Sequence, residues 1–231
     1  MLSFLATPFS FILKFLYGIF GHYWIAIVIL SVAIRVAMYP VYKRQIMSTA
    51  GMEDFSKKSK EIQTKYANDR EMMNIKMAEL QKESGYNPMS GCLPLIIQMV
   101  VISGLFVLLR YPLNYITDEN MVFAVHESFL WIQDLSQPDP WILPIMSAIA
   151  TFVSFSLTSK ANAGVQANSS MNFMKYVFPL MILWLARSYP AGIAIYWFIS
   201  QFTQIFFNLR FNKLRKEIKE QGVKAGKKKN K

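Results

Sequence analysis

The chain has 231 residues, of which 53% are hydrophobic, 15% aromatic and only 17% charged, whereas an ordinary soluble domain has about 25% charged residues. Lysine and arginine number 25 against 14 acidic residues, so the formal net charge is +11. This combination excludes a disordered chain and argues against a simple nucleic-acid binder, and it is typical of a membrane protein with basic cytoplasmic segments.

The first element is an apolar segment over residues 3–20, which is interrupted by Pro8, Lys14 and Gly18. It is unlike a signal peptide, because its start carries no side-chain cation and no small-residue cleavage site follows it. We predict an interfacial helix that lies on the outer leaflet. A sixth membrane span is the alternative.

Five further apolar stretches are suited to cross a bilayer, which takes about 20 residues per helix. Proline and glycine residues mark their limits, and Pro190 with Gly192 divides the last stretch by a tight turn. We therefore predict transmembrane helices over 23–42, 92–109 and 141–159, and a hairpin of two such helices over 174–209.

Residues 43–87, between the first two spans, carry nine positive and seven negative side chains. Apolar residues fall on one helical stripe before Asn68 and on another after it; they are Met52, Phe55, Ile62 and Tyr66, then Met73, Met77 and Leu80. We predict a cytoplasmic hairpin of two amphipathic helices whose stripes pack on each other. The methionine-rich face is also suited to meet changing partners.

The loop charges orient the spans, because cytoplasmic loops are enriched in lysine and arginine. The hairpin 43–87 holds nine such residues and the tail 210–231 holds ten, whereas the opposite side holds only Lys14, Arg110 and Arg187. We therefore predict that the hairpin, the loop 160–173 and the tail are cytoplasmic. The loop 110–140 and the N terminus are then extracellular.

Arg35 lies deep in the first predicted span, eight residues before Lys43. A charged side chain at the centre of a bilayer costs about 3 kcal/mol or more, so it needs a counter-ion or water. None of the acidic residues lies in a predicted span. We predict that Arg35 faces a hydrated cavity. The alternative is snorkelling to the headgroups over about 12 Å of helix.

Polar residues recur on single faces of the other spans. Such residues often bond neighbouring helices, but bulky amides near an unpaired arginine favour a hydrophilic groove. The fifth span carries Trp197, Ser200, Gln201, Gln204 and Asn208, the third Ser147, Thr151, Ser154 and Thr158, the second Gln98 and Ser103, and the first Ser31. We select Arg35, Ser31, Gln98, Trp197, Ser200, Gln201 and Gln204 as the substrate groove.

The sequence has no constellation for catalysis. Cys92 is the single cysteine, the two histidines lie far apart, and the common hydrolase and nucleotide-binding motifs are missing. We expect no enzymatic activity, no cofactor and no metal. A positive groove suits an acidic peptide segment, or alternatively an anion or small solute that passes a channel or transporter with Arg35 as its selectivity charge.

Four strings, in this order, resemble the YidC/Oxa family of membrane protein insertases. They are RVAMYP at 35–40, NPMSGCLPLIIQM at 87–99, WIQDLS at 131–136 and PAG at 190–192, the last leading to Tyr196 and Trp197. The resemblance covers about residues 3 to 210. It is closest to the short bacterial type that lacks a large periplasmic domain.

The resemblance implies an all-α polytopic membrane protein, with five transmembrane helices around a groove that opens to the cytoplasm and the lipid. It assigns Arg35 as the groove arginine, Ser31 as a polar contact one turn earlier, Gln98 as a client contact and Trp197 as part of the aromatic pair in the fifth span. The implied clients are nascent membrane proteins entering the bilayer of the bacterial cell membrane.

Partners implied by the resemblance are the targeting machinery at the hairpin, the ribosome at the basic tail and the general secretion channel. The tail 210–231 has a net charge of +8, which suits ribosomal RNA. Anionic lipid is an equally good partner for such a tail, so both interpretations stay open.

Overall fold

The computed structural model describes residues 3–43, 52–84, 93–116, 118–161 and 169–229. Most of these residues are helical, and they contain no strand beyond an isolated bridge between Phe129 and Ile132. The prediction of an all-α fold is therefore confirmed. Over the described residues, no helix combines the length and the apolar character that crossing a membrane requires. The predicted loop 160–173 lies largely outside the described residues.

Two helices begin the chain, α1 (Ser3–Phe20) and α2 (Tyr23–Ala37). Gly21 separates them: it has φ +70° and donates its backbone N–H to the Tyr17 carbonyl at 2.8 Å, a conformation that glycine adopts without strain. The single helix predicted over 23–42 is interrupted at Met38, and the chain is helical again over 39–43. The break follows from Pro40, which disfavours a helical backbone just before it.

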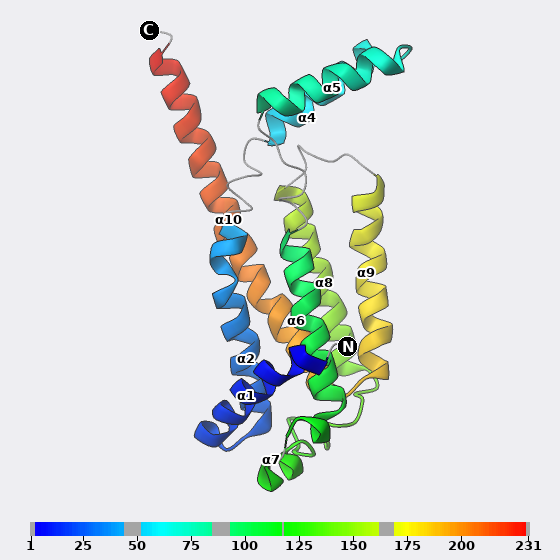
Figure 1. Ribbon diagram of the computed structural model, residues 1–231, viewed down its shortest axis with the longest axis vertical. Helices are drawn as coiled ribbons and strands as arrows, with labels where there is room; N and C mark the ends of the chain where they lie inside the picture. Colours follow the sequence, from blue (N-terminus) through cyan, green and yellow to red (C-terminus); the bar gives the residue numbers. More distant parts are fainter. Residues whose placement is uncertain (1–2, 44–51, 85–92, 117, 162–168, 230–231) are drawn as a thin grey trace.

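The hairpin consists of α4 (Met52–Lys65) and α5 (Arg70–Ser84), and in Figure 1 it projects from one end of the bundle. The Asp69 carboxylate accepts a hydrogen bond from the Met72 amide at 3.0 Å and so caps α5. Between the helices, Ser59 lies against the Met77 sulfur at 3.5 Å, and Leu80 is buried. The described parts of the two helices thus pack on each other.

The bundle is completed by α6 (Leu93–Arg110), η2 (Pro112–Asn114), α7 (Glu119–Ala124), α8 (Ile142–Ala161), α9 (Ser169–Ser188) and α10 (Ala191–Lys229). In Figure 1, α7 lies at the end of the bundle opposite the hairpin; we call these two ends the α7 end and the hairpin end. Helix α10 contacts α8, α2, α6 and α9, while α1 packs across α6 and α2. Helix α10 therefore lies at the centre of the bundle.

Helix α10 does not stop at residue 209, where the predicted fifth span ends, but continues through the basic segment to Lys229. The loss of apolar residues marks the end of a potential span, but it does not mark the end of a helix. Lysine, arginine and glutamate are good helix formers, so the backbone continues without a break.

The bundle has polar residues inside and large apolar residues outside. Arg35, Ser147, Thr151, Ser200 and Asn208 are all buried. Large apolar side chains are exposed along the helices; they include Phe11, Phe15, Ile149, Leu180, Trp184 and Phe206. An apolar exterior of this extent indicates an apolar environment, because soluble monomers rarely expose large contiguous apolar patches.

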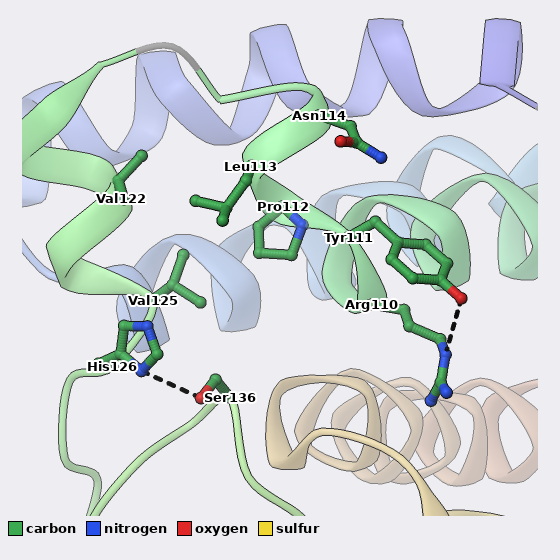
Figure 2. A pocket seen from close by; sticks show the side chains of 9 residues that line it. All are labelled: Arg110, Tyr111, Pro112, Leu113, Asn114, Val122, Val125, His126 and Ser136. Atoms are coloured by element: carbon green, nitrogen blue, oxygen red, sulfur yellow. Dashed lines mark hydrogen bonds between the residues drawn. The ribbon is translucent and has the colours of Figure 1, made fainter.

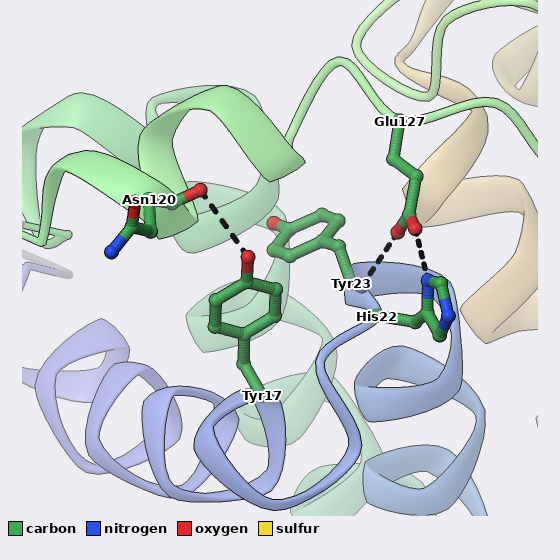
Figure 3. A network of polar contacts seen from close by, with 5 residues as sticks. All are labelled: Tyr17, His22, Tyr23, Asn120 and Glu127. Carbon is green, nitrogen blue, oxygen red and sulfur yellow. Dashed lines mark hydrogen bonds and ion pairs between the residues drawn. The ribbon is translucent and has the colours of Figure 1, made fainter.

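The loop 125–141 supplies caps to the helices that meet it at the α7 end. The Glu127 carboxylate accepts the Tyr23 amide at 2.7 Å and also contacts the His22 ring (Figure 3). The Gln137 carbonyl accepts the Ala191 amide at 2.9 Å, and Asp139 caps α8. The first turns of α2, α8 and α10 are thus held by one loop, which ties this end together.

Asp139 is the most heavily bonded of these caps. Its buried carboxylate accepts the Trp131 indole N–H at 2.8 Å and three amides of the first turn of α8, at 3.0 to 3.3 Å. Burial opposes ionisation of this carboxyl, but the four donors outweigh it and hold the pKa of Asp139 below its usual range.

We expect Asp139→Asn to destabilise the fold by about 1 to 2 kcal/mol at pH 6, because a neutral amide cannot accept from all four donors. Since the pKa is lower in the folded state, the carboxylate stabilises the fold above about pH 4, and this contribution disappears as the pH falls toward the folded-state pKa. Thermal unfolding midpoints of the two proteins should therefore differ at pH 6 and converge near pH 3.

Asp118→Asn is the matched control for this prediction, because Asp118 caps the short α7 through a single amide, that of Met121 at 3.3 Å. Its midpoint should fall by less than that of Asp139→Asn. A difference between Asp139→Asn and the parent protein that is the same at both pH values would contradict the assignment.

Candidate functional site

Arg35 lies inside the bundle with 4% of its surface exposed. Its Nη1 donates to the Tyr42 hydroxyl at 2.9 Å and to the Gln204 side-chain oxygen at 3.2 Å, while its Nε has no hydrogen-bond partner among the described residues. The ion pairs found in the described part of the chain do not include Arg35. The guanidinium is therefore a buried cation that only neutral groups hold.

The hydrogen bonds continue from Gln204 across the bundle. Its side-chain nitrogen donates to the Asn208 oxygen at 3.0 Å, and the Asn208 nitrogen donates to the Ser154 carbonyl at 3.2 Å and the Thr158 hydroxyl at 3.1 Å. We call Tyr42, Arg35, Gln204, Asn208, Ser154 and Thr158 the polar chain. It connects α2, α10 and α8, so three helices meet at one polar cluster.

A second polar contact lies between α6 and α10. The Gln98 side-chain nitrogen donates to the Tyr196 hydroxyl at 3.3 Å, whereas the Gln98 oxygen has no partner among the described residues. The hydroxyl of Ser200, one turn after Tyr196, is also buried without a partner there, and Gln201 is buried beside it in sequence. Buried polar atoms without protein partners indicate places where water or a ligand binds.

Two predicted site residues make other contacts. The Ser31 hydroxyl donates to the Ile27 carbonyl of its own helix at 2.6 Å. The Trp197 indole donates to the Thr151 hydroxyl of α8 at 2.9 Å. Among the described residues, neither is hydrogen-bonded to the polar chain, so of the predicted residues the structure joins Arg35 directly to Gln204 alone.

Five residues of these clusters were not among the selected ones, namely Tyr42, Tyr196, Asn208, Ser154 and Thr158. Asn208 carried a signal, because it continues the polar face of Gln204 by one turn. Tyr196 precedes Trp197, and neither periodicity nor charge distinguishes it. Tyr42 lies seven residues after Arg35, close to two helical turns, so helical spacing places it on the same face and could have indicated it.

A cavity of about 280 Å³ lies at the α7 end, away from the polar chain. Arg110, Tyr111, Val125 and His126 are among its lining residues (Figure 2). His126 contacts Asp134 at 3.0 Å, and the hydrogen bonds from Ser136 and His126 outweigh the effect of burial and lower the pKa of the Asp134 carboxyl. No group of three metal-ligating side chains occurs among the residues that the structure describes.

Chemically, the polar chain is suited to bind a negative group. It contains a permanent cation and neutral hydrogen-bonding groups. Hydroxyls occur in it, but no described histidine or carboxylate contacts them as a general base.

Comparison with known proteins gives consistent matches. Residues 15–219 match the model of the family described as 60Kd inner membrane protein. The chain is 31% identical over 228 residues to "Membrane protein insertase YidC 2" of Listeria innocua, covering 96% of this chain and 75% of that protein. It is 33% identical over 181 residues to "Membrane protein insertase YidC" of Fusobacterium nucleatum, covering 78% of this chain and 81% of the relative.

A solved structure has a similar fold. Its title is "Active YidC insertase crystal structure with the first transmembrane domain resolved", and the TM-score is 0.62 at 22% identity. The match covers 88% of this chain and 45% of that one. It supports the helical architecture described above.

Proposed function

The chain belongs to the family of the 60Kd inner membrane protein and the YidC insertases, and from this premise we propose that it inserts hydrophobic clients with short translocated segments from the cytoplasm into the lipid bilayer through a positively charged hydrophilic groove. It is accordingly a bacterial membrane protein and a membrane protein insertase. The groove, the topology and the roles of single residues are the proposed part.

The observation that carries the groove mechanism is the environment of Arg35. A buried guanidinium without a carboxylate partner is stable only if neutral dipoles or water replace its hydration. Tyr42 and Gln204 supply part of this, and the buried Nε has no acceptor among the described residues. An acidic residue in a client segment is such an acceptor, and Coulomb attraction draws it toward Arg35.

The distribution of polar and apolar surface supports the remaining step. Helix α9 exposes Leu180 and Trp184 by 65% and 68%, whereas α10 buries Ser200, Gln201 and Asn208. A client whose polar part lies against the interior groups therefore finds lipid beside the bundle for its apolar part. The client is thereby transferred without a nucleotide or a cofactor.

The charge distribution supports an orientation. The basic hairpin and tail follow the hairpin end of the bundle, and the acidic residues Asp118, Glu119, Glu127, Asp134 and Asp139 lie toward the α7 end. We therefore place the hairpin end in the cytoplasm, with the N terminus outside and the C terminus inside. The caps supplied by loop 125–141 then close the bundle on the outer side.

The decisive experiment uses liposomes that contain only this protein. A small single-span client with a short acidic outer tail is added, and insertion is read from protease protection of that tail. We expect protection to require the protein. If a correctly folded protein gives no protection but carries an anion flux, the channel interpretation replaces this one.

A further inference from the structure

The polar chain has a direction, because each amide in it presents its oxygen on one side and its nitrogen on the other. Gln204 turns its oxygen toward Arg35 and its nitrogen toward Asn208. Asn208 repeats this arrangement, with its oxygen toward Gln204 and its nitrogen toward α8. Both amide nitrogens of the polar chain therefore point away from Arg35.

In the part of the polar chain that runs from Arg35 to Ser154, only the two end groups have fixed polarity. The guanidinium of Arg35 can only donate, and the backbone carbonyl of Ser154 can only accept. A side-chain amide has no such constraint, since a half-turn exchanges its oxygen and nitrogen at little cost unless its neighbours select one orientation. The Arg35 guanidinium selects the orientation of Gln204, the Ser154 carbonyl selects that of Asn208, and the bond between the two amides makes these orientations support each other.

Tyr42 holds the guanidinium from the other side. Its hydroxyl accepts from Arg35 Nη1 at 2.9 Å, and its ring is buried in a small apolar cluster with Met38 and Phe211. The ring packing fixes the place of the hydroxyl. The same Nη1 thus takes both neutral acceptors, and Nε is left without a partner among the described residues.

We propose that Asn208 and Tyr42 are positioning residues for Arg35: through the oriented Gln204 amide and the Tyr42 hydroxyl they hold Nη1, and so keep the guanidinium in the place where its charge attracts a client carboxylate. This inference rests on the proposed groove function. Without Asn208, the Gln204 nitrogen loses its acceptor, and the Gln204 side chain is then held by its bond to Arg35 alone and can shift its position. Arg35 would leave its place, and recognition of acidic clients would weaken.

The test compares two clients that differ only in the translocated segment, one with aspartates and one with asparagines at the same positions. Insertion into liposomes is measured for both clients with the full-length protein. The result is the ratio of the amount of acidic client inserted to the amount of neutral client inserted. Asn208→Leu removes the amide, and Tyr42→Phe removes only the hydroxyl and keeps the ring in its cluster. Thr203→Val is the control on α10, because its hydroxyl donates to Ile199 of its own helix at 2.8 Å.

We expect Asn208→Leu and Tyr42→Phe each to lower the ratio by about threefold or more, since each affects a hydrogen bond to a charged group, while Thr203→Val keeps the parent ratio. A merely structural role would reduce insertion of both clients alike, and that outcome overturns the inference. An unchanged ratio overturns it as well. Thermal midpoints of the variants show that they are folded.

The Arg35→Ala protein distinguishes a failure of the groove function from a failure of the positioning inference. If it loses insertion of the acidic client while Asn208→Leu and Tyr42→Phe keep the parent ratio, only the positioning inference is wrong. If Arg35→Ala inserts the acidic client as well as the parent does, the groove function and the positioning inference are both overturned.

Discussion

Replacement of Arg35 by alanine should reduce insertion of a client with an acidic translocated segment by about tenfold or more in liposomes. A pair of unit charges about 4 Å apart attracts with about 4 kcal/mol at an effective dielectric constant of 20, and loss of a third of this attraction corresponds to about a factor of ten. Arg35 is buried and has no acidic partner among the described residues, so this attraction is available to a client.

Two further substitutions of Arg35 separate charge from volume. Arg35→Lys keeps the cation and should retain more activity than Arg35→Ala, whereas Arg35→Met fills the space without charge and should resemble alanine. Arg110→Ala removes an equivalent charge at the α7 end, where the guanidinium lies over the Tyr189 ring, and should leave insertion near the parent level. Equal activity of the methionine and lysine variants would exclude charge as the cause.

A side chain at Gly104 should separate α1 from α6. A Cβ atom built there would lie 2.7 Å from the Phe9 ring and 2.8 Å from the Leu5 backbone oxygen. The ring can rotate, but the backbone oxygen moves only with its helix. We expect Gly104→Leu to lower the free energy of unfolding by about 1 to 3 kcal/mol, with Gly104→Ala intermediate. Thermal unfolding and limited proteolysis within α1 measure the effect.

Gly18→Ala is the matched control, because nothing lies within 4 Å of the Cβ position at Gly18. An alanine inside a helix is favoured over glycine by about 0.5 to 1 kcal/mol, so Gly18→Ala should leave the protein equally stable or more stable. A similar loss of stability from substitution at Gly18 and at Gly104 would show that close packing at Gly104 is not the cause of the destabilisation. It would also weaken the role given to α1 as a support for α6.

Local features of the sequence predicted most helices well. Apolar runs between proline and glycine residues placed α6 and α8 within a few residues of their observed bounds and placed the turn between α9 and α10, whereas α9 begins before residue 174 and α10 continues well past residue 209 to Lys229. The break between α4 and α5 also lies where Asn68 and Asp69 indicated it. These limits depend on near neighbours in the chain, since a proline ring or a change in hydrophobic period acts within one or two turns.

Periodicity was less informative about partners. It placed Gln204 and Asn208 on one face of α10, but it did not show that Gln204 meets α2 while Asn208 meets α8. It also assigned Trp197 to the same face, although its indole bonds to Thr151. Such contacts depend on how each helix is rotated and where it crosses its neighbours, which local spacing does not specify.

The sequence by itself determined that the chain is helical, that its charge is concentrated on one side and that Arg35 has no acidic neighbour in any predicted span. Tertiary structure alone decided which neutral groups hold that charge. Tyr42 holds Arg35 from two turns further along the chain, with its ring buried against Phe211 of α10, and Gln204 is tied to α8 through Asn208. Burial makes a cation without a partner unfavourable, so the sequence revealed the need for such groups, while the packing of distant helices selected them.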